Sequence, residues 1–475
     1  MRVGLRSLLG LTLTVGGLAC SDDTNSEAEA GSETDTGDGD GDPGDGDGDG
    51  DGDGDGDGDG DGDGDGDGDG DGDGDGDDEH CPPLGEPPPK GPIIIVDPSM
   101  AAELPQMVAD AEPNTTFSFA DGTYDLSTAN LLHVTTHGLR FVGQNADREA
   151  VVLDANYALG EIFLVAASNV TIAHMTVQRA QWHPIHVTGG AAANVENTLI
   201  YDVAVIDPGQ QAIKINPSGE GFYVDNGTVA CSAVILTDAG RGQVQDCYTG
   251  GIDAHSAWGW LVRDNYFEGF WCDSGLSEHA VHFWVTGRDT VVERNTIVDC
   301  ARGVGFGLGQ NGNGNQRVYD DNPCPGADYL GHVDGEIRNN MIFASRPELF
   351  ASQSGVDSGV ALEQACGARV HHNTVFFTQE PFVAIEYRWA NTSAEIVNNL
   401  VSQNIVMRDG AQASLIGNMA GQGAEHFEDA TLGELHLVDG SAAIDAGDPV
   451  TLEWVGTDFD GDARDGMPDI GADER

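Results

Sequence analysis

The chain has 475 residues and a formal net charge of −61, from 81 acidic and 20 basic residues. Such acidity argues against nucleic-acid binding, which depends on clustered basic side chains. Residues 1–78 hold 27 acidic and 2 basic residues (−25), which leaves 54 acidic and 18 basic residues (−36) for the rest of the chain.

The first 20 residues have the pattern of a signal peptide. Two arginines give a short basic start, and the apolar run from Ser7 to Ala19 is too short to span a bilayer. Ala19-Cys20 resembles a bacterial lipoprotein processing site, which implies lipidation of Cys20 and membrane attachment through that lipid alone. Gly17 stands where such sites usually carry Leu, so secretion after cleavage nearby is the alternative. We therefore expect an exported protein, either secreted or anchored at the cell surface or outer membrane.

Residues 21–92 are expected to form a disordered linker. Residues 21–78 are mostly Asp-Gly dipeptides without aromatic or large aliphatic side chains, so they cannot bury enough apolar surface to fold. The Pro-rich stretch that follows Cys81 is a stiff second spacer. Carboxylates are hard oxygen ligands that could bind Ca²⁺ loosely, although a solvated spacer is the simpler interpretation.

Short strands recur from residue 93 to the end of the chain. Between Gly250 and Leu308, apolar and polar residues alternate in short runs that end at Gly, Asp or Asn. An asparagine recurs at the same place in successive units, at Asn265, Asn295, Asn340, Asn373, Asn399 and Asn418. Stacked coils explain this repeat, because asparagine tolerates left-handed backbone at a bend and its amide can hydrogen-bond to its copy in the next coil.

Further motifs extend this pattern. They are Asn169-Val-Thr-Ile-Ala-His-Met-Thr-Val, Thr290-Val-Val-Glu-Arg-Asn-Thr-Ile-Val-Asp, Ala443-Ile-Asp-Ala-Gly, Asp458-Phe-Asp-Gly and Asp469-Ile-Gly-Ala-Asp-Glu. Together they resemble right-handed parallel β-helix, or pectin-lyase-like, proteins. The resemblance implies an all-β fold in which residues 93–475 form a single-stranded right-handed parallel β-helix, a solenoid that we expect to be monomeric. Helical apolar spacing at Pro105–Ala111 predicts an N-terminal capping helix that covers the first coil.

Seven cysteines lie beyond Cys20. Export implies an oxidising compartment, where pairs form if geometry permits. The pairs to consider first are Cys231 with Cys247, Cys272 with Cys300, and Cys324 with Cys366, with Cys81 left over, although connectivity does not follow from sequence. The cysteines lack the close spacing of a zinc site. A Gly/Asn-rich stretch at residues 309–331 breaks the repeat, either as the rim of a groove or as a flexible insertion.

One face of the predicted coil gathers polar side chains. The strands that start at Ile185, Ile213, Ile252, Val281, Val304, Val360 and Val383 have apolar first and third residues, which face the core. The second column holds His186, Lys214, Asp253 and His282, the fourth holds Thr188, Asn216, His255, Trp284, Glu363 and Glu386, and His183 precedes its strand. These side chains should point to solvent from coils about 4.8 Å apart. Lys214 is one of two lysines in the chain, and pairing with Asp253 alone could also explain it.

A groove along stacked coils suits an extended polymer, and many proteins of the resembled fold cleave acidic polysaccharides. β-Elimination needs a base for the proton beside a uronate carboxylate and a cation for the developing enolate. We therefore predict a carbohydrate-active, polysaccharide lyase-like protein for uronic-acid polymers, with Lys214 as carboxylate clamp, His255 or His282 as base, and Asp253 keeping Lys214 charged. The candidate substrate-binding residues are His183, His186, Asn216, Trp284, Glu363 and Glu386. The negative body repels a polyanion at long range, which local cations or Ca²⁺ would have to overcome.

Two other functions fit the sequence. Glycoside hydrolysis needs two carboxyl groups about 5–10 Å apart, and Glu363 and Glu386 are expected on adjacent coils. A non-catalytic surface protein, structural or glycan-binding, would also use an anchor, a spacer and a rigid rod. A Lys214 on a shallow, flat face would favour the binding protein, whereas a Lys214 flanked by loops would favour an enzyme.

Overall fold

The structure is a computed structural model that describes residues 81–85, 91–309 and 317–475. The chain divides into two compact units, Met1–Asp75 and Gly76–Arg475, and every described residue belongs to the second. The expected signal peptide with Cys20, and the Asp-Gly part of the expected linker, lie outside the described residues. Within the described ranges, no helix is both long and apolar enough to cross a membrane.

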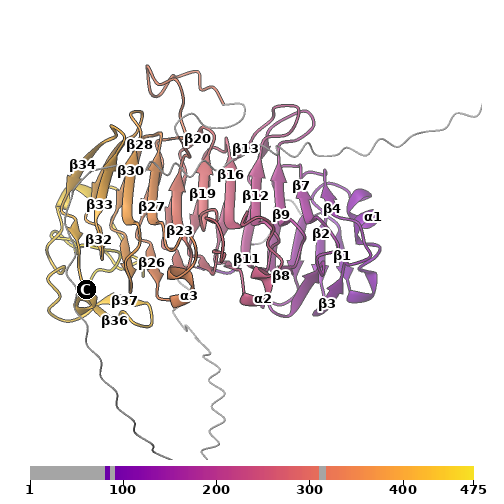
Figure 1. Cartoon of the computed structure of the whole chain (residues 1–475). Coiled ribbons are helices and arrows are strands. Elements are labelled where there is room, and N and C mark those ends of the chain that lie inside the picture. Colours follow the sequence, from indigo (N-terminus) through magenta and orange to yellow (C-terminus); the bar gives the residue numbers. More distant parts are fainter. Residues whose placement is uncertain (1–80, 86–90, 310–316) are drawn as a thin grey trace, which may run out of the picture. The chain divides into compact units, whose positions relative to one another are not determined.

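The second unit is a right-handed parallel β-helix (Figure 1). Successive turns of the chain add one strand, or one bent pair of strands, to each of two long sheets, so each coil hydrogen-bonds to the one before it. The strand pairs within both sheets are parallel, and the described residues contain one antiparallel strand pair, β36 with β37. The expected all-β solenoid is confirmed.

The sheet that carries the site has ten strands in the described residues. In chain order they are β4 (Leu132–Val134), β7 (Glu161–Val165), β9 (His183–Thr188), β12 (Gln211–Asn216), β16 (Gly250–His255), β19 (Val281–Trp284), β23 (Arg302–Phe306), β27 (Ser358–Glu363), β30 (Val383–Arg388) and β33 (Ile405–Arg408). Each strand pairs with the next one in this order.

The second long sheet forms the remaining walls of the coil. Its strands are β1 (Ile93–Val96), β2 (Thr116–Phe119), β3 (Gly122–Asp125), β5 (Arg140–Gly143), β6 (Val151–Asp154), β8 (Thr171–Gln178), β11 (Leu199–Ile206), β14 (Thr228–Ala230), β15 (Ala233–Ile235), β17 (Leu261–Arg263), β18 (Tyr266–Glu268), β20 (Gly287–Arg288), β21 (Val291–Glu293), β22 (Thr296–Val298), β24 (His332–Val333), β25 (Glu336–Arg338), β26 (Met341–Ala344), β28 (Ala365–His371), β29 (Thr374–Phe377), β31 (Ser393–Val397), β32 (Leu400–Val401), β34 (Gln412–Ile416) and β35 (Met419–Ala420). Two short sheets pair β10 (Val195–Glu196) with β13 (Val224–Asp225) and β36 (Phe427–Asp429) with β37 (Glu434–Leu437).

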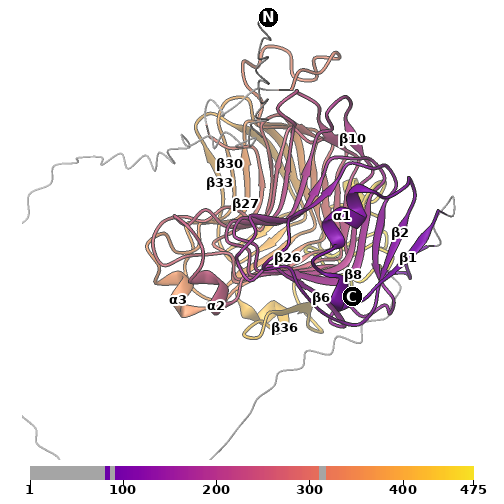
Figure 2. The same cartoon turned by 90° about the vertical axis from the view of Figure 1, so that its right-hand side faces the viewer.

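Helices are few and short. They are α1 (Leu104–Ala109), α2 (Asp238–Arg241), α3 (Pro347–Phe350), η1 (Pro98–Met100), η2 (Ala424–His426) and η3 (Pro449–Thr451). The expected capping helix Pro105–Ala111 is observed as α1, which lies across the N-terminal end of the coil (Figure 2). Its Leu104 and Val108 are buried in the core that fills the coil. The helix therefore covers apolar surface that the first coil would otherwise expose.

The recurring asparagines form a buried ladder inside the coil. The Nδ2 of Asn265 donates to the Oδ1 of Asn295 at 2.9 Å, and the same bond repeats through every successive member to Asn418. The expected amide contacts are confirmed, but the expectation that these asparagines adopt left-handed backbone is wrong. The left-handed residue at each bend is the one before the asparagine, at Asp264, Arg294, Asn339, His372, Asn398 and Gly417.

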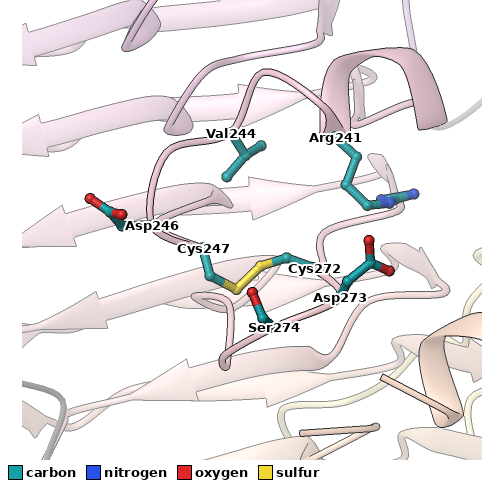
Figure 3. Close-up of a pocket in the computed structure, with 7 residues that line it drawn as sticks. All are labelled: Arg241, Val244, Asp246, Cys247, Cys272, Asp273 and Ser274. Carbon is teal, nitrogen blue, oxygen red and sulfur yellow. A yellow bond between two sulfur atoms is a disulfide. The ribbon is translucent and has the colours of Figure 1, made fainter. Parts of the chain in front are cut away.

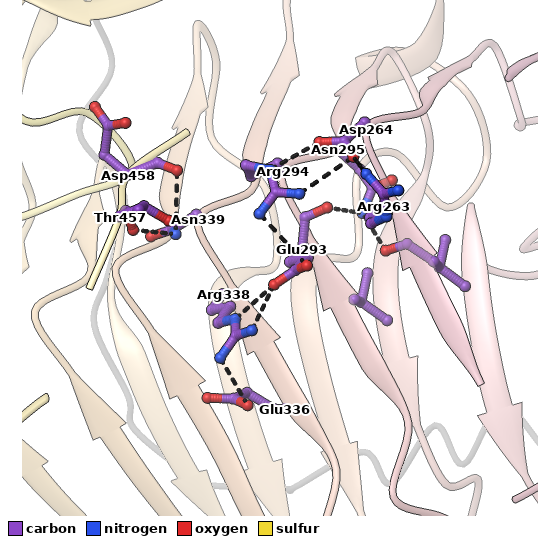
Figure 4. A network of polar contacts seen from close by, with 12 residues as sticks. Arg263, Asp264, Glu293, Arg294, Asn295, Glu336, Arg338, Asn339, Thr457 and Asp458 are labelled. Carbon is purple, nitrogen blue, oxygen red and sulfur yellow. Dashed lines mark hydrogen bonds and ion pairs between the residues drawn. The ribbon is translucent and has the colours of Figure 1, made fainter. Parts of the chain in front are cut away.

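The outer surface of the second sheet carries ion pairs that run along the stack (Figure 4). Arg338 lies 2.6 Å from Glu293 and 3.1 Å from Glu336, while Arg294 lies 2.7 Å from Asp264. The C-terminal segment docks beside this network, where buried Arg464 donates hydrogen bonds to Asn339 and to two backbone carbonyls. The motifs near the end of the chain thus fix that segment against the coils.

Three disulfides are present among the described residues, and only one of the three expected pairs is among them. Cys324–Cys366 is confirmed, whereas the other bonds are Cys81–Cys231 and Cys247–Cys272. The expected pairs Cys231–Cys247 and Cys272–Cys300 are wrong, and Cys300 is a buried free thiol whose pKa burial raises to about 12. Two cysteines can pair only where their corners of the coils lie side by side. The spacing of cysteines along the chain does not show which corners are neighbours.

Candidate functional site

Two polar rows cross the outer face of the ten-stranded sheet. Strand pairing places Lys214 beside His186 on one side and beside Asp253 on the other, and Asp253 beside His282. The fourth position of each strand continues the site, because Asn216 pairs with Thr188 and His255 pairs with Trp284. The predicted register of these coils is confirmed, and we name Lys214, Asp253 and His255 the central triad.

The central triad is tightly connected. The ammonium of Lys214 donates to Asp253 and lies 3.2 Å from the Nε2 of His255. That Nε2 is 3.4 Å from the Oδ1 of Asp253, which also accepts a 2.7 Å hydrogen bond from the indole N–H of Trp284. Asp253 therefore orients three neighbours at once.

The expectation that this row points into open solvent is wrong. The exposed fractions are 8% for Lys214, 1% for Asp253 and 0% for His282, although all three project outward from the sheet. Chain segments between the strands cover them, since Tyr248 hydrogen-bonds to Lys214 and Glu278 contacts His282. The side chain of His255 keeps 24% of its surface exposed, so a ligand can reach the central triad at this imidazole.

The charges of the central triad follow from burial and from these contacts. Burial opposes ionisation of Asp253, but Lys214 and His255 outweigh it and hold the pKa of Asp253 well below its usual range. Burial acts against the charge of Lys214, yet Asp253 and Tyr248 raise the pKa of its ammonium. Burial and the charge of Lys214 lower the pKa of His255. At neutral pH the centre thus holds a cation, an anion and a neutral imidazole.

His282 belongs to a second cluster next to the central triad. Its Nδ1 lies 3.1 Å from Glu278 and 4.0 Å from Asp253, and its Nε2 donates to the carbonyl of Gly307 at 3.0 Å. Burial opposes its charge, but Glu278 raises the pKa of His282. His279 stacks beside it with ring centroids 4.3 Å apart, and burial with the charge of His282 lowers the pKa of His279 to about 3.

The other predicted contact residues surround the centre. His186 bridges Glu161 at 2.6 Å and Asn216, so these two form a polar edge on the neighbouring coils. His183 is buried, with its Nδ1 donating to the carbonyl of Gln211 at 3.1 Å. Trp284 is buried as well, edge-on to His255 at 4.5 Å.

Glu363 and Glu386 do not stack as expected. Glu386 pairs with Ala361, and Glu363 pairs with Arg388, so the predicted register of β30 is wrong by two residues. Both carboxylates are buried on the same face, where Glu386 accepts a 3.0 Å hydrogen bond from Arg408. Burial and the charge of Glu363 raise the pKa of Glu386.

A disulfide ties together two of the segments beside the site. Cys247 and Cys272 join the loop that carries Tyr248 to the loop that leads to Glu278. A pocket of about 430 Å³ opens at this bond and is lined by Arg241, Val244, Asp246, Cys247, Cys272, Asp273 and Ser274 (Figure 3). Its lining is largely polar, and it lies on the loops, outside the two polar rows of the sheet.

Sequence reasoning missed three residues of the site, which are Tyr248, Glu278 and His279. A signal existed for His279, because it precedes the first apolar residue of its strand by two positions, as His183 does. Gln211 occupies the same position and is buried, and neither of its amide atoms has a hydrogen-bond partner among the residues that the structure describes. Tyr248 and Glu278 lie on loops whose sequence has no periodic pattern. Their contacts with the central triad and with His282 therefore could not be predicted from the sequence.

Comparison with known proteins bears on the fold. A family model described as "Right handed beta helix region" matches residues 160–342, which include both clusters. No curated protein matches the sequence. An alginate lyase from Paenibacillus sp. str. FPU-7 is 14% identical and has a TM-score of 0.48, with 68% of this chain and 99% of that one covered. The activity of so distant a protein does not carry over.

Other solved structures resemble the chain to a similar degree. Pectate lyase Pel9A is 14% identical with a TM-score of 0.43, covering 81% of this chain and 97% of its own. PfbA, a surface adhesin of Streptococcus pneumoniae, is 12% identical with a TM-score of 0.44, covering 67% and 87%. Function has to come from this chain's own residues, because a fold alone does not determine an activity.

Proposed function

We propose that this protein is an exported polysaccharide lyase that acts on uronic-acid polymers. The central triad is the observation that carries the proposal. Lys214 is flanked by loops and held between a carboxylate and a partly exposed imidazole, an arrangement that a flat binding surface would not require. Export, with Cys20 as the lipid anchor, is part of the same proposal and rests on residues 1–20.

His255 is the base in this proposal. A base must be neutral before it takes a proton, and burial together with Lys214 lowers the pKa of His255, which keeps it neutral at pH 7. Its exposed edge can reach the proton beside the uronate carboxylate. His282, the other histidine considered, is fully buried with both ring nitrogens in contact with other groups, so it fits this role less well.

Lys214 supplies the positive charge. Its raised pKa keeps the ammonium charged, and a uronate whose proton reaches His255 brings its carboxylate towards that ammonium, 3.2 Å from the imidazole. A fixed cation in a poorly hydrated site stabilises the enolate that forms as the proton leaves. The imidazolium of His255 can then return the proton to the departing glycosidic oxygen, which completes the elimination without a net change in the enzyme.

Glycoside hydrolysis is the second candidate, and one observation favours it. The raised pKa of Glu386 suits a general acid, and Glu363 lies on the same face of the sheet. The two are offset by two residues along adjacent strands, which places them farther apart than direct neighbours. The Lys214 cluster has no part in that reaction, so we rank it below elimination.

A panel of uronic-acid and neutral polysaccharides tests the proposal. Elimination leaves an unsaturated sugar, so the proposal expects ultraviolet absorbance to rise with a uronic-acid polymer. New reducing ends without that absorbance would point to hydrolysis and overturn the proposal. Retention on a glycan column without any cleavage would identify a binding protein and would overturn it as well.

A further inference from the structure

The chain just before β19 brings three metal-binding side chains together. Glu278 and His279 lie on the corner that precedes the strand, and His282 is the second residue of the strand itself. The carboxylate of Glu278 is 3.1 Å from the Nδ1 of His282 and 3.9 Å from the Nδ1 of His279. One ligand atom from each of the three residues lies within 4.8 Å of the others. A single ion could therefore contact all three.

His279 is a buried histidine whose ring nitrogens are free to bind an ion. It is 2% exposed, and among the described residues neither Nδ1 nor Nε2 has a partner within hydrogen-bonding distance, since the carboxylate of Glu278 is 3.9 Å from Nδ1. A buried polar group without a partner is rare in native proteins. The ring lies across Gly305, where any side chain would collide with it, because an added Cβ would stand 2.6 Å from the Nε2. The fold thus reserves space for an imidazole that it leaves without a partner.

His282 has the orientation of a ligand. Its Nε2–H donates to the carbonyl of Gly307 at 3.0 Å and its Nδ1 donates to Glu278 at 3.1 Å, so an ion bound here would replace the Nδ1 proton between the two side chains. Histidines that bind metals commonly fix their second nitrogen in this way. The nearby Arg302 is neutralised by Asp357 at 2.9 Å, so its charge does not oppose an ion here.

We propose that Glu278, His279 and His282 bind a divalent transition-metal ion, with Zn²⁺ as the best fit. Two imidazoles and one carboxylate are donors that Zn²⁺ accepts in a tetrahedral site with its fourth position open. Ca²⁺ prefers six to eight oxygen ligands, so it fits this cluster poorly. The site adjoins Asp253 but does not rest on the lyase proposal, because its test is binding.

The described residues hold one other cluster of this kind, His436 with Asp460 and Asp473. Both ring nitrogens of its histidine have partners, because Nδ1 contacts Glu434 and Nε2 lies 2.9 Å from Asp460. Each of its three side chains has a hydrogen-bond partner within the described part of the chain. That cluster provides the matched control, because it has the same ligand types in the same chain.

The test uses the full chain and two probes. Zn²⁺ is titrated by calorimetry, and Co²⁺ is added as a spectroscopic substitute whose visible absorption reports nitrogen ligation. We expect one tight equivalent of Zn²⁺ and Co²⁺ absorption bands in the wild type, with both retained in His436→Ala. The affinity should fall at least about tenfold in His279→Ala and in Glu278→Gln, which preserves size and so guards against misfolding.

Two results would overturn the site. Wild-type protein without a tight equivalent or without the Co²⁺ bands would show that no such site exists. Unchanged stoichiometry and bands in a folded His279→Ala or Glu278→Gln would place the ion on other nitrogen ligands. One tight equivalent of Zn²⁺ without the Co²⁺ bands would place it on carboxylates, for example those of residues 21–78. The Co²⁺ spectrum separates these cases, because carboxylates alone do not give the bands of nitrogen ligation.

Discussion

Lys214 matters to stability as well as to chemistry. The sequence predicted that Lys214 would point to solvent, but its ammonium is buried against Asp253. Lys214→Ala would leave the carboxylate of Asp253 buried without its main partner, which typically costs about 3–5 kcal/mol. Urea unfolding of the variant should show this loss.

A double variant provides the control for this prediction. Lys214→Met with Asp253→Leu removes both charges and should recover most of the lost stability. If Lys214→Ala unfolds at the wild-type urea concentration, the pair is not buried as described. This coupling also means that the rate of Lys214→Ala cannot by itself identify the active site.

His332 makes stability depend on pH. It is fully buried, stacked 4.1 Å from Phe306, and burial with the charge of His282 lowers its pKa to about 3. The imidazole of His332 therefore stays neutral in the folded protein under conditions where the unfolded chain, with an ordinary histidine pKa of about 6.5, binds a proton. Its stabilising contribution is complete above pH 6.5 and is lost as the pH falls towards 3.

The size of this loss of stability follows from the interval between the pKa of His332 in the unfolded chain and its pKa in the folded protein. Between pH 7 and pH 5 the wild type should lose about 2 kcal/mol of unfolding free energy through His332 alone. His332→Gln should be less stable at pH 7 but should lose about 2 kcal/mol less on acidification. Urea unfolding at both pH values measures the difference, and an equal loss in the two proteins would contradict the assignment.

The asparagine ladder is the element that joins coil to coil. Asn340 accepts from the backbone and side chain of Asn295 and donates to Asn373 at 2.9 Å, all in the core. Asn340→Ala leaves several buried groups without partners and should cost about 2–3 kcal/mol. Asn418→Ala at the partly buried end of the ladder is the control and should cost less. Thermal denaturation of Asn340→Ala at the wild-type temperature would show that the ladder adds nothing, and equal destabilisation of the two variants would contradict the role of burial.

Alternation along the strands explains what the sequence could predict at this scale. Core and outer residues have to alternate, so the row of His186, Lys214, Asp253 and His282 followed from Ile185, Ile213 and their equivalents. A shift of two residues keeps every side chain on its own face, so alternation could not detect the error at Glu386.

The loops set the limit of sequence prediction. Tyr248 and Glu278 bury the central triad and its neighbour, but they lie in segments with no repeat. Their positions depend on packing and on the Cys247–Cys272 bond, which spacing along the chain did not reveal. The residues of the centre could thus be predicted, while their burial and the metal-binding cluster could not.

The charge of the whole molecule should govern how it meets an acidic polymer. Residues beyond 78 carry −36, so a polyuronate is repelled at long range. Salt shortens the reach of this repulsion from about 30 Å at 0.01 M to about 8 Å at 0.15 M. The rate constant kcat/KM for a uronic-acid polymer should therefore rise between these salt concentrations. A fall over the same range would indicate a locally positive groove that attracts the substrate.

The pH dependence of kcat/KM for unsaturated product, compared between wild type, His255→Gln and His133→Gln, tests the central claim most directly. His133 is exposed in the same outer row and pairs with Leu164, remote from the triad, so His133→Gln should behave as wild type. The lowered pKa of His255 places the acid limb of the wild-type profile below pH 6.5. His255→Gln should lose at least about a hundredfold in rate together with that limb. A His255→Gln protein that keeps both the wild-type rate and the acid limb would contradict the account.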